Sequence, residues 1–140
     1  MWTCPDCGRV FRNTRQWHSC QKENLEGHFR NRPPALRQLF DELNTFITEL
    51  GPVEVSPVKT AILFRRGATF LAVNVKPDHL KLEFQLEHEA EDLVISRSVR
   101  VSGNRVFHEA VIDEGADIHE RLKQWITEAY GLISGTNNQD

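Results

Sequence analysis

The 140-residue chain lacks several features that point directly to an activity. It contains only three cysteines, and all of them lie within the first twenty residues, so none remains elsewhere for nucleophilic catalysis. The sequence has no glycine-rich phosphate loop and no G-x-S-x-G motif. No apolar run approaches the roughly 20 residues of a membrane-spanning helix. The first residues do not form a basic segment followed by an apolar one, so we expect no secretory signal and no membrane association.

The composition is that of a folded globular protein. Hydrophobic residues make up 39% of the chain and charged residues 26%, which argues against disorder. An odd number of closely spaced cysteines is a poor basis for a disulfide framework and a good basis for a metal site. Reduced cysteines indicate a cytoplasmic location.

The three cysteines form a metal-ligand pattern with one histidine. Two residues separate Cys4 from Cys7, and ten residues then separate Cys7 from His18, which is followed by Cys20. Thiolate sulfur and imidazole nitrogen are the ligands of tetrahedral structural zinc sites. Because four protein ligands leave no open position on the metal, we expect one structural Zn²⁺ that stabilises the segment and does not catalyse a reaction.

The identity of the fourth ligand has two alternatives. His18 and Cys20 are two positions apart, and such residues point about 200° apart on a regular helix. His18 and Cys20 can therefore bind the same ion only if a helix that contains them ends or distorts around Ser19. His28, eight residues after Cys20, is the alternative ligand. We favour His18 because it requires no long ordered excursion of the chain.

Charge is divided unequally along the chain, whose formal net charge is −3. Residues 1–37 contain seven basic and three acidic residues, a net charge of +4, whereas residues 38–140 contain ten basic and seventeen acidic residues, a net charge of −7. The excess of basic residues in the first 37 positions, which includes Arg9, Arg12 and Arg15, indicates an anionic partner such as nucleic acid. The alternatives are a protein partner or a charge-balanced contact between the two parts of the chain.

The remaining sequence predicts an α+β domain. Apolar residues recur at three- and four-residue steps over residues 34–50, which predicts a helix that ends at Gly51. A second helix is expected from Asp117, with Asp117 as its N-cap and Glu120 completing a capping box. Between the helices we expect strands at residues 53–55, 59–65, 69–76, 79–87, 94–102 and 105–112.

This order predicts an antiparallel sheet of five or six strands with both helices on one face. The predicted organisation is a zinc finger at residues 1–22, a linker at 23–33, an α+β domain at 34–133 and a disordered tail at 134–140.

Two further sites are conceivable in the α+β domain. Lys59, Arg65 and His108 would form an anion-binding surface if they converged, although ordinary mixing of surface charges and a structural role for His108 are the alternatives. Asp78, followed by Glu83 and Gln85, has a distant likeness to the acidic pattern of metal-dependent nucleases. A binding module is therefore favoured, and a small enzyme or ligand-binding domain is the alternative.

The chain resembles a known family over about residues 1–133. Its first part, with residues 2–9, Phe11, Gln16 and residues 18–20, is similar to the short Cys/His finger that precedes a bacterial domain of unknown function. The main domain of that family is similar in the stretches 51–53, 57–60, 70–73 and 117–119, with Trp125 and residues 128–130. The resemblance implies a zinc finger followed by an α+β domain, and no reaction.

Overall fold

The computed structural model describes residues 1–3, 10–14 and 21–137, with side chains described except at Phe11, 21–24 and 134–137. Two short strands, β1 (Trp2–Thr3) and β2 (Val10–Phe11), precede helix α1 (Gln21–His28). The main domain then runs through helix α2, six strands, a 3₁₀ turn and helix α3. These are α2 (Pro34–Thr48), β3 (Glu54–Pro57), β4 (Ile62–Arg66), β5 (Ala68–Val75), β6 (Leu80–Leu86), β7 (Ile95–Ser102), β8 (Arg105–Ile112), η1 (Gly115–Asp117) and α3 (Glu120–Asn137).

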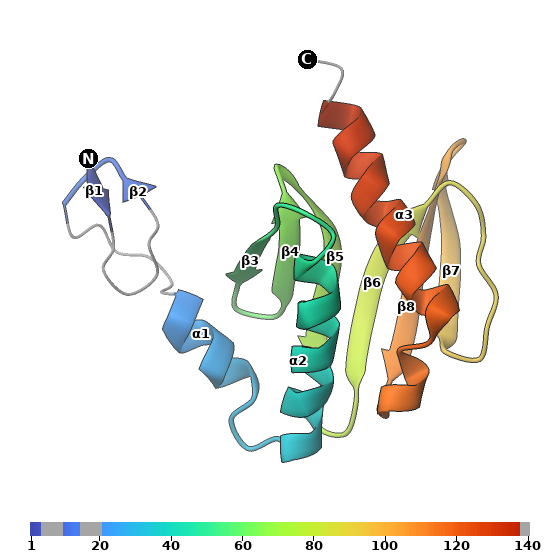
Figure 1. Cartoon of the computed structure of the whole chain (residues 1–140), viewed down its shortest axis with the longest axis horizontal. Helices are drawn as coiled ribbons and strands as arrows, with labels where there is room; N and C mark the ends of the chain where they lie inside the picture. The colour runs from blue at the N-terminus through green and yellow to red at the C-terminus, as the bar shows by residue number, and fades with distance from the viewer. Residues whose placement is uncertain (4–9, 15–20, 138–140) are drawn as a thin grey trace.

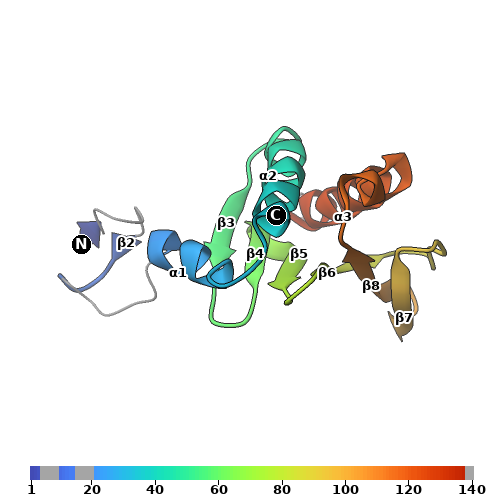
Figure 2. The ribbon, with the colours of Figure 1, turned by 90° about the horizontal axis from the view of Figure 1, so that it is seen from below.

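The six strands form one open antiparallel sheet in the order β3-β4-β5-β6-β8-β7. Helices α2 and α3 lie side by side against the sheet (Figure 1), and the view from below shows both on the same side of it (Figure 2). The predicted α+β class, the antiparallel sheet and the placement of both helices on one face are therefore confirmed. No helix in the described part of the chain is both long and apolar enough to cross a bilayer.

Hydrophobic periodicity explains this two-layer arrangement. In β6, Leu80, Leu82, Phe84 and Leu86 are buried while the residues between them are partly or fully exposed, so one face of the strand packs under the helices. Helix α2 buries an apolar stripe at three- and four-residue spacing, and α3 does the same. These stripes are Leu36, Leu39, Phe40, Leu43 and Ile47 on α2, and Leu122, Trp125, Ile126, Ala129 and Tyr130 on α3.

The structure corrects the expected start and end of helix α3 and the expected end of helix α2. Helix α3 starts at Glu120, and Asp117 does not cap it: its carboxylate accepts backbone hydrogen bonds from Asp113 (2.9 Å) and Glu114 (3.2 Å), which closes the preceding turn. Helix α3 also continues through Asn137, beyond the boundary expected at residue 133, and residues 138–140 lie outside the described part. Helix α2 ends at Thr48, slightly earlier than expected.

The predicted linker contains an ordered helix. Helix α1 occupies residues 21–28, and Leu25 and Phe29 pack against the main core. The Phe29 ring lies 5.3 Å from the ring of Phe40 on α2. The Nε2 atom of His28 lies 2.7 Å from the backbone carbonyl of Val58. The sequence predicted a connector here, with at most one short helical turn at residues 25–29, because residues 21–33 are mostly polar and lack a clear period.

Gly51 occupies a position that only glycine fits without strain. Its φ is +149°, and a Cβ added there would overlap the hydroxyl of Tyr130, which itself donates a hydrogen bond to the carbonyl of Pro52 (3.2 Å). The Gly51→Ala substitution is therefore expected to lower the free energy of unfolding by about 1–3 kcal/mol in urea denaturation. Gly103→Ala is the matched control, because a Cβ at Gly103 meets nothing within 4 Å. Equal effects of the two substitutions would contradict this account.

Candidate functional site

The described residues around the cysteine pattern form a strand–strand–helix frame. Strands β1 and β2 pair in an antiparallel register, Trp2 with Phe11 and Thr3 with Val10. The segment that joins them carries Cys4 and Cys7, and α1 begins one residue after Cys20. The predicted ligands Cys4, Cys7, His18 and Cys20, and the basic residues Arg9 and Arg15, lie outside the described residues. Among residues 1–3, 10–14 and 21–137, no three His, Cys, Asp or Glu side chains gather as a metal site.

His28, the alternative fourth ligand, is engaged by the main domain. Its Nε2 lies 2.7 Å from the carbonyl oxygen of Val58, and because a carbonyl can only accept, Nε2 carries the proton in this contact. A metal would have to be bound by Nδ1 while this contact persists. The position of His28 on the last turn of α1 gives it a structural task, that of holding α1 against the loop that follows β3.

The structure does not bring Lys59, Arg65 and His108 together. Lys59 is exposed in the turn between β3 and β4, and Arg65 lies near the other end of β4. His108 is fully buried on β8, which two strands, β5 and β6, separate from β4. Adjacent strands are about 4.8 Å apart, so β4 and β8 lie roughly 14 Å apart. Arg12, the described member of the basic N-terminal group, is exposed.

His108 is part of the core. Its Nε2 accepts a hydrogen bond from the backbone N–H of Ala90 (2.9 Å), and its ring stacks on Phe84 with 5.4 Å between centroids. Burial lowers the pKa of His108, and this outweighs the opposing effect of the Val106 carbonyl. A histidine that is held neutral offers no positive charge to an anion.

The residues of the nuclease hypothesis also have ordinary partners. Asp78 lies in the turn before β6, where its carboxylate is 2.7 Å from Nδ1 of His79. Glu83 lies on the sheet face opposite the helices and pairs with Lys81 at 3.5 Å. These two carboxylates therefore do not share a metal site within the described residues.

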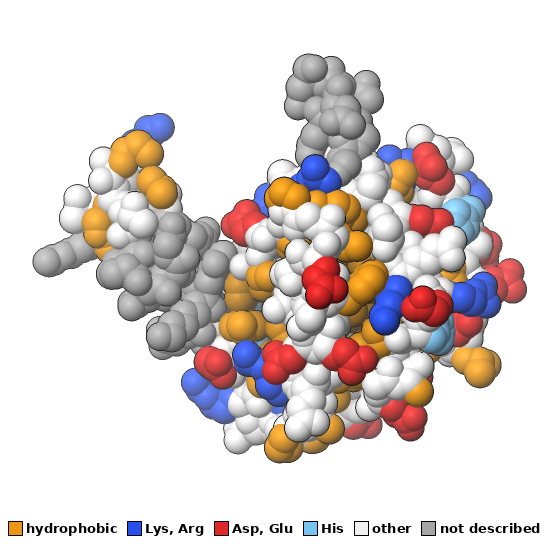
Figure 3. Space-filling model, in the orientation of Figure 1, with side chains coloured by type: hydrophobic (Ala, Val, Ile, Leu, Met, Phe, Trp, Pro, Cys, Tyr) orange, Lys and Arg blue, Asp and Glu red, His pale blue; other side chains and the backbone are white. Residues whose placement is uncertain are grey.

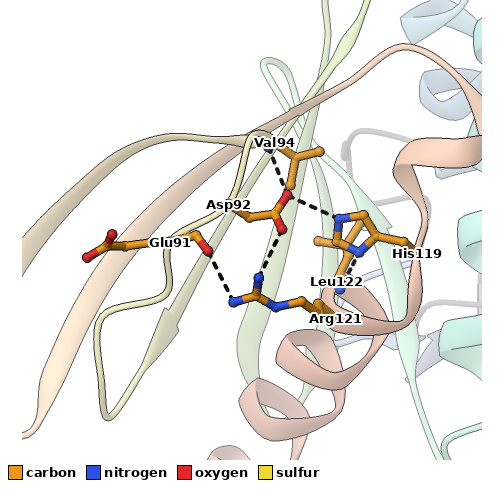
Figure 4. Close-up of polar contacts among 6 residues, drawn as sticks. All are labelled: Glu91, Asp92, Val94, His119, Arg121 and Leu122. Carbon is orange, nitrogen blue, oxygen red and sulfur yellow. Dashed lines mark hydrogen bonds and ion pairs between the residues drawn. The ribbon is translucent and has the colours of Figure 1, made fainter.

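A polar cluster that the sequence did not reveal joins the loop before β7 to the start of α3 (Figure 4). The carboxylate of Asp92 lies 3.2 Å from Nε2 of His119 and 3.2 Å from Nη1 of Arg121. Nδ1 of His119 in turn accepts a hydrogen bond from the backbone N–H of Leu122 at 3.1 Å, so this histidine caps α3. Because Nδ1 accepts and Nε2 donates, both ring nitrogens are used structurally, which argues against a catalytic Asp–His pair.

The charge of Asp92 is stabilised in this cluster. The backbone N–H of Val94, His119 and Arg121 together hold the pKa of Asp92 below its usual range, against the opposing effect of burial. Because the pKa of Asp92 is lower in the folded state, its ionised carboxylate stabilises the fold at pH values above the ordinary aspartate pKa. This contribution to stability is lost as the pH falls through the lowered pKa.

The Asp92→Asn substitution is therefore expected to destabilise the protein more at pH 7 than at pH 3. The difference arises because the carboxylate is ionised in both the folded and unfolded states at pH 7, and its partners favour the ionised form only in the folded state. Urea midpoints of the two chains at both pH values measure this. A constant difference between the chains across this pH range would show that Asp92 titrates alike in both states.

Comparisons with known proteins identify the family of the main domain. No curated protein matches the chain, and no solved structure matches it. A family model described as a domain of unknown function, DUF5655, matches residues 25–133. This confirms the resemblance for the main domain, and nothing in the match bears on the zinc finger or on a bacterial origin. The match spans α1 from Leu25 onward, the whole sheet and α3 as far as Ile133, and the chain belongs to the DUF5655 family.

Proposed function

We propose that residues 1–22 bind one structural Zn²⁺ through Cys4, Cys7, His18 and Cys20 and present a basic surface to nucleic acid. The observation that carries this proposal is the pairing of β1 with β2 on either side of Cys4 and Cys7, followed by a helix immediately after Cys20. A strand–strand–helix order around a C-x2-C turn is the frame in which small zinc fingers hold their metal. So short a segment has little core of its own, and the metal supplies most of its folding free energy.

His18 is the preferred fourth ligand for two reasons. His28 uses Nε2 to contact the carbonyl of Val58, and Cys20 precedes the first residue of α1. His18 and Cys20 lie outside the described residues, and the proposal requires that the two do not sit on one regular helix, where they would point about 200° apart.

The charge distribution favours nucleic acid over an acidic protein surface as the partner class. The net charge of +4 over residues 1–37 contrasts with −7 over the rest of the chain. On the helix side of the main domain, basic and acidic side chains are interspersed (Figure 3), which gives no broad basic surface there. Arg12 and Arg30 are exposed, and neither forms an ion pair with another described residue.

Salt dependence tests this function. Binding of a fluorescent single-stranded or double-stranded oligonucleotide is expected to weaken steeply as salt rises, because each phosphate contact releases a counterion. Arg12→Glu is expected to weaken binding at low salt and to reduce the salt slope by about one or two units.

Lys59→Glu is the matched control, since it makes the same charge change at an exposed position in the main domain. The nucleic-acid proposal fails if binding is absent at low salt, or if the two variants lose affinity equally. A partner that binds with the same affinity at low and high salt would instead indicate a protein interface.

A further inference from the structure

An irregularity in β5 separates it from its neighbour β6. Phe64 pairs with Leu71 and Arg65 with Thr69, so Phe70 is an extra residue that forms a β-bulge. The ladder between β5 and β6 extends from Val75 and Leu80 to Ala72 and Glu83. Both strands continue beyond that last pair, but no further pair joins them in this fully described part of the sheet. The bulge therefore parts the two central strands of the sheet.

A cleft of about 270 Å³ opens at this separation. Helix α3 contributes Ala129, Leu132 and Ile133 to its walls, and strands β5, β6 and β8 contribute all the others. Its apolar lining is rich in aromatic and aliphatic side chains, and four polar side chains border it. The strand residues that line it are Thr69, Phe70, Leu71, Ala72, Glu83, Phe84, Gln85, Arg105 and Phe107. A mostly apolar cleft with a few convergent polar groups is the usual form of a small-molecule site.

The polar groups of the cleft differ in what they offer. Glu83 accepts hydrogen bonds and is balanced by Lys81 at 3.5 Å. Gln85 is exposed, and its amide makes no hydrogen bond within the described residues. Arg105 uses Nη1 for both of its contacts, with the Asn104 carbonyl (2.8 Å) and with Glu87 (3.8 Å). Its other guanidinium nitrogens have no partner among the described residues, so it has donors for an anion.

The order of these groups along the sheet sets the length of a ligand. Glu83 pairs with Glu109 and Gln85 with Phe107, and Arg105 is two residues beyond Phe107 on β8. Glu83 lies opposite Glu109, which is four residues from Arg105 on β8. The Cα atoms of Glu83 and Arg105 are therefore roughly 13 Å apart along the strands at about 3.3 Å per residue, and the long arginine side chain can shorten the distance between the two charged groups. A ligand that contacts both has hydrogen-bond donors at one end, an apolar middle and an anion at the other end.

We propose that this cleft binds a nucleoside monophosphate. Glu83, Gln85, Arg105 and Phe107 alternate with buried residues and lie on the sheet face away from the helices. On that side of the cleft the base lies against Phe107, its exocyclic amine donates to Glu83, Gln85 bonds to the base edge, and the phosphate pairs with Arg105. A volume of about 270 Å³, just below the usual range for ligand pockets, suits one nucleotide better than two. The same chemistry is offered by a free mononucleotide and by one unpaired nucleotide of a single strand. This inference concerns the main domain and does not depend on the zinc segment.

Calorimetric titration of the full chain with the monophosphates of adenosine, cytidine and uridine tests this inference. Adenosine and cytidine monophosphates are expected to bind, and uridine monophosphate, which lacks the amine, to bind at least tenfold more weakly. Glu83→Gln is expected to remove this preference, and Ala72→Trp, which fills the cleft, to abolish binding. Glu54→Gln on β3 makes the same change as the first variant outside the cleft and should leave binding unchanged.

Two comparisons keep the result interpretable. The thermal midpoint of each variant shows whether it is folded. Glu83 is partly exposed, so the result for Glu83→Gln remains informative even if Ala72→Trp does not fold. A hexanucleotide that binds more tightly than the mononucleotide, with the gain lost in Ala72→Trp, identifies a strand nucleotide as the occupant. Equal or weaker hexanucleotide binding identifies the free nucleotide.

Arg12→Glu should leave mononucleotide affinity unchanged, so failure of the finger proposal and failure of the cleft proposal are separate results. The cleft proposal is overturned if none of the three monophosphates binds at millimolar concentration. It is also overturned if Glu83→Gln and Ala72→Trp, both folded, bind adenosine monophosphate as the unchanged chain does.

Discussion

The Cys7→Ser substitution is expected to reduce bound zinc from one ion per chain to almost none, measured by elemental analysis of freshly purified protein. Serine does not supply the thiolate that Zn²⁺ requires, and three remaining ligands hold the ion far more weakly. The same loss is expected for His18→Ala. This is the largest effect that the account predicts, because in the proposed finger the metal would supply most of the folding free energy of residues 1–22.

The matched control for the histidine is His28→Ala. Because Nε2 of His28 contacts the Val58 carbonyl, this substitution is expected to keep the zinc and to loosen the attachment of α1 to the main domain. Hydrogen exchange over residues 21–29 should then rise. If His28→Ala loses the metal and His18→Ala keeps it, the fourth ligand is His28 and the assignment made here is wrong.

The Phe40→Ala substitution is expected to lower the free energy of unfolding by about 3–5 kcal/mol. Phe40 is 1% exposed, and its ring lies 5.3 Å from Phe29 and 6.0 Å from Phe64, between the segment after α1 and the sheet. Removal of the ring leaves a cavity that three elements border. Urea denaturation followed by circular dichroism measures the change.

Phe46→Ala on the same helix is the comparison for Phe40. Phe46 is only partly buried, with the ammonium of Lys123 5.6 Å from its ring centroid, so the expected loss is about 1 kcal/mol. The ratio of the two effects reports how much more deeply Phe40 is packed than Phe46. Similar losses for the two substitutions would mean that Phe40 does not occupy the centre of this packing.

The sequence was sufficient to predict the helices and strands whose apolar residues recur with a clear period. The alternation from Leu80 to Leu86 predicted a strand with one buried face, and the stripe from Leu36 to Ile47 predicted a helix. The proline at position 34 marked the start of α2, since the first turn of a helix tolerates a residue without an N–H. Two amphipathic helices around a run of strands then favoured one two-layer sheet.

The features that the sequence did not reveal depend on contacts between distant residues. The bulge at Phe70 has no composition signal, because the extra residue is defined only by its partners on β4. The cap of α3 by His119 was missed because histidine is an uncommon cap, and Asp117 with Glu120 matched a commoner pattern. The convergence of Lys59, Arg65 and His108 was a guess about tertiary placement, and strand order separates β4 from β8.

Zinc-edge X-ray absorption of the purified, unmodified chain tests the central claim most directly. The account predicts one zinc per chain with three sulfur ligands at about 2.3 Å and one nitrogen ligand at about 2.0–2.1 Å. Protein purified without zinc, or a zinc ion surrounded by oxygen and nitrogen ligands alone, would contradict it.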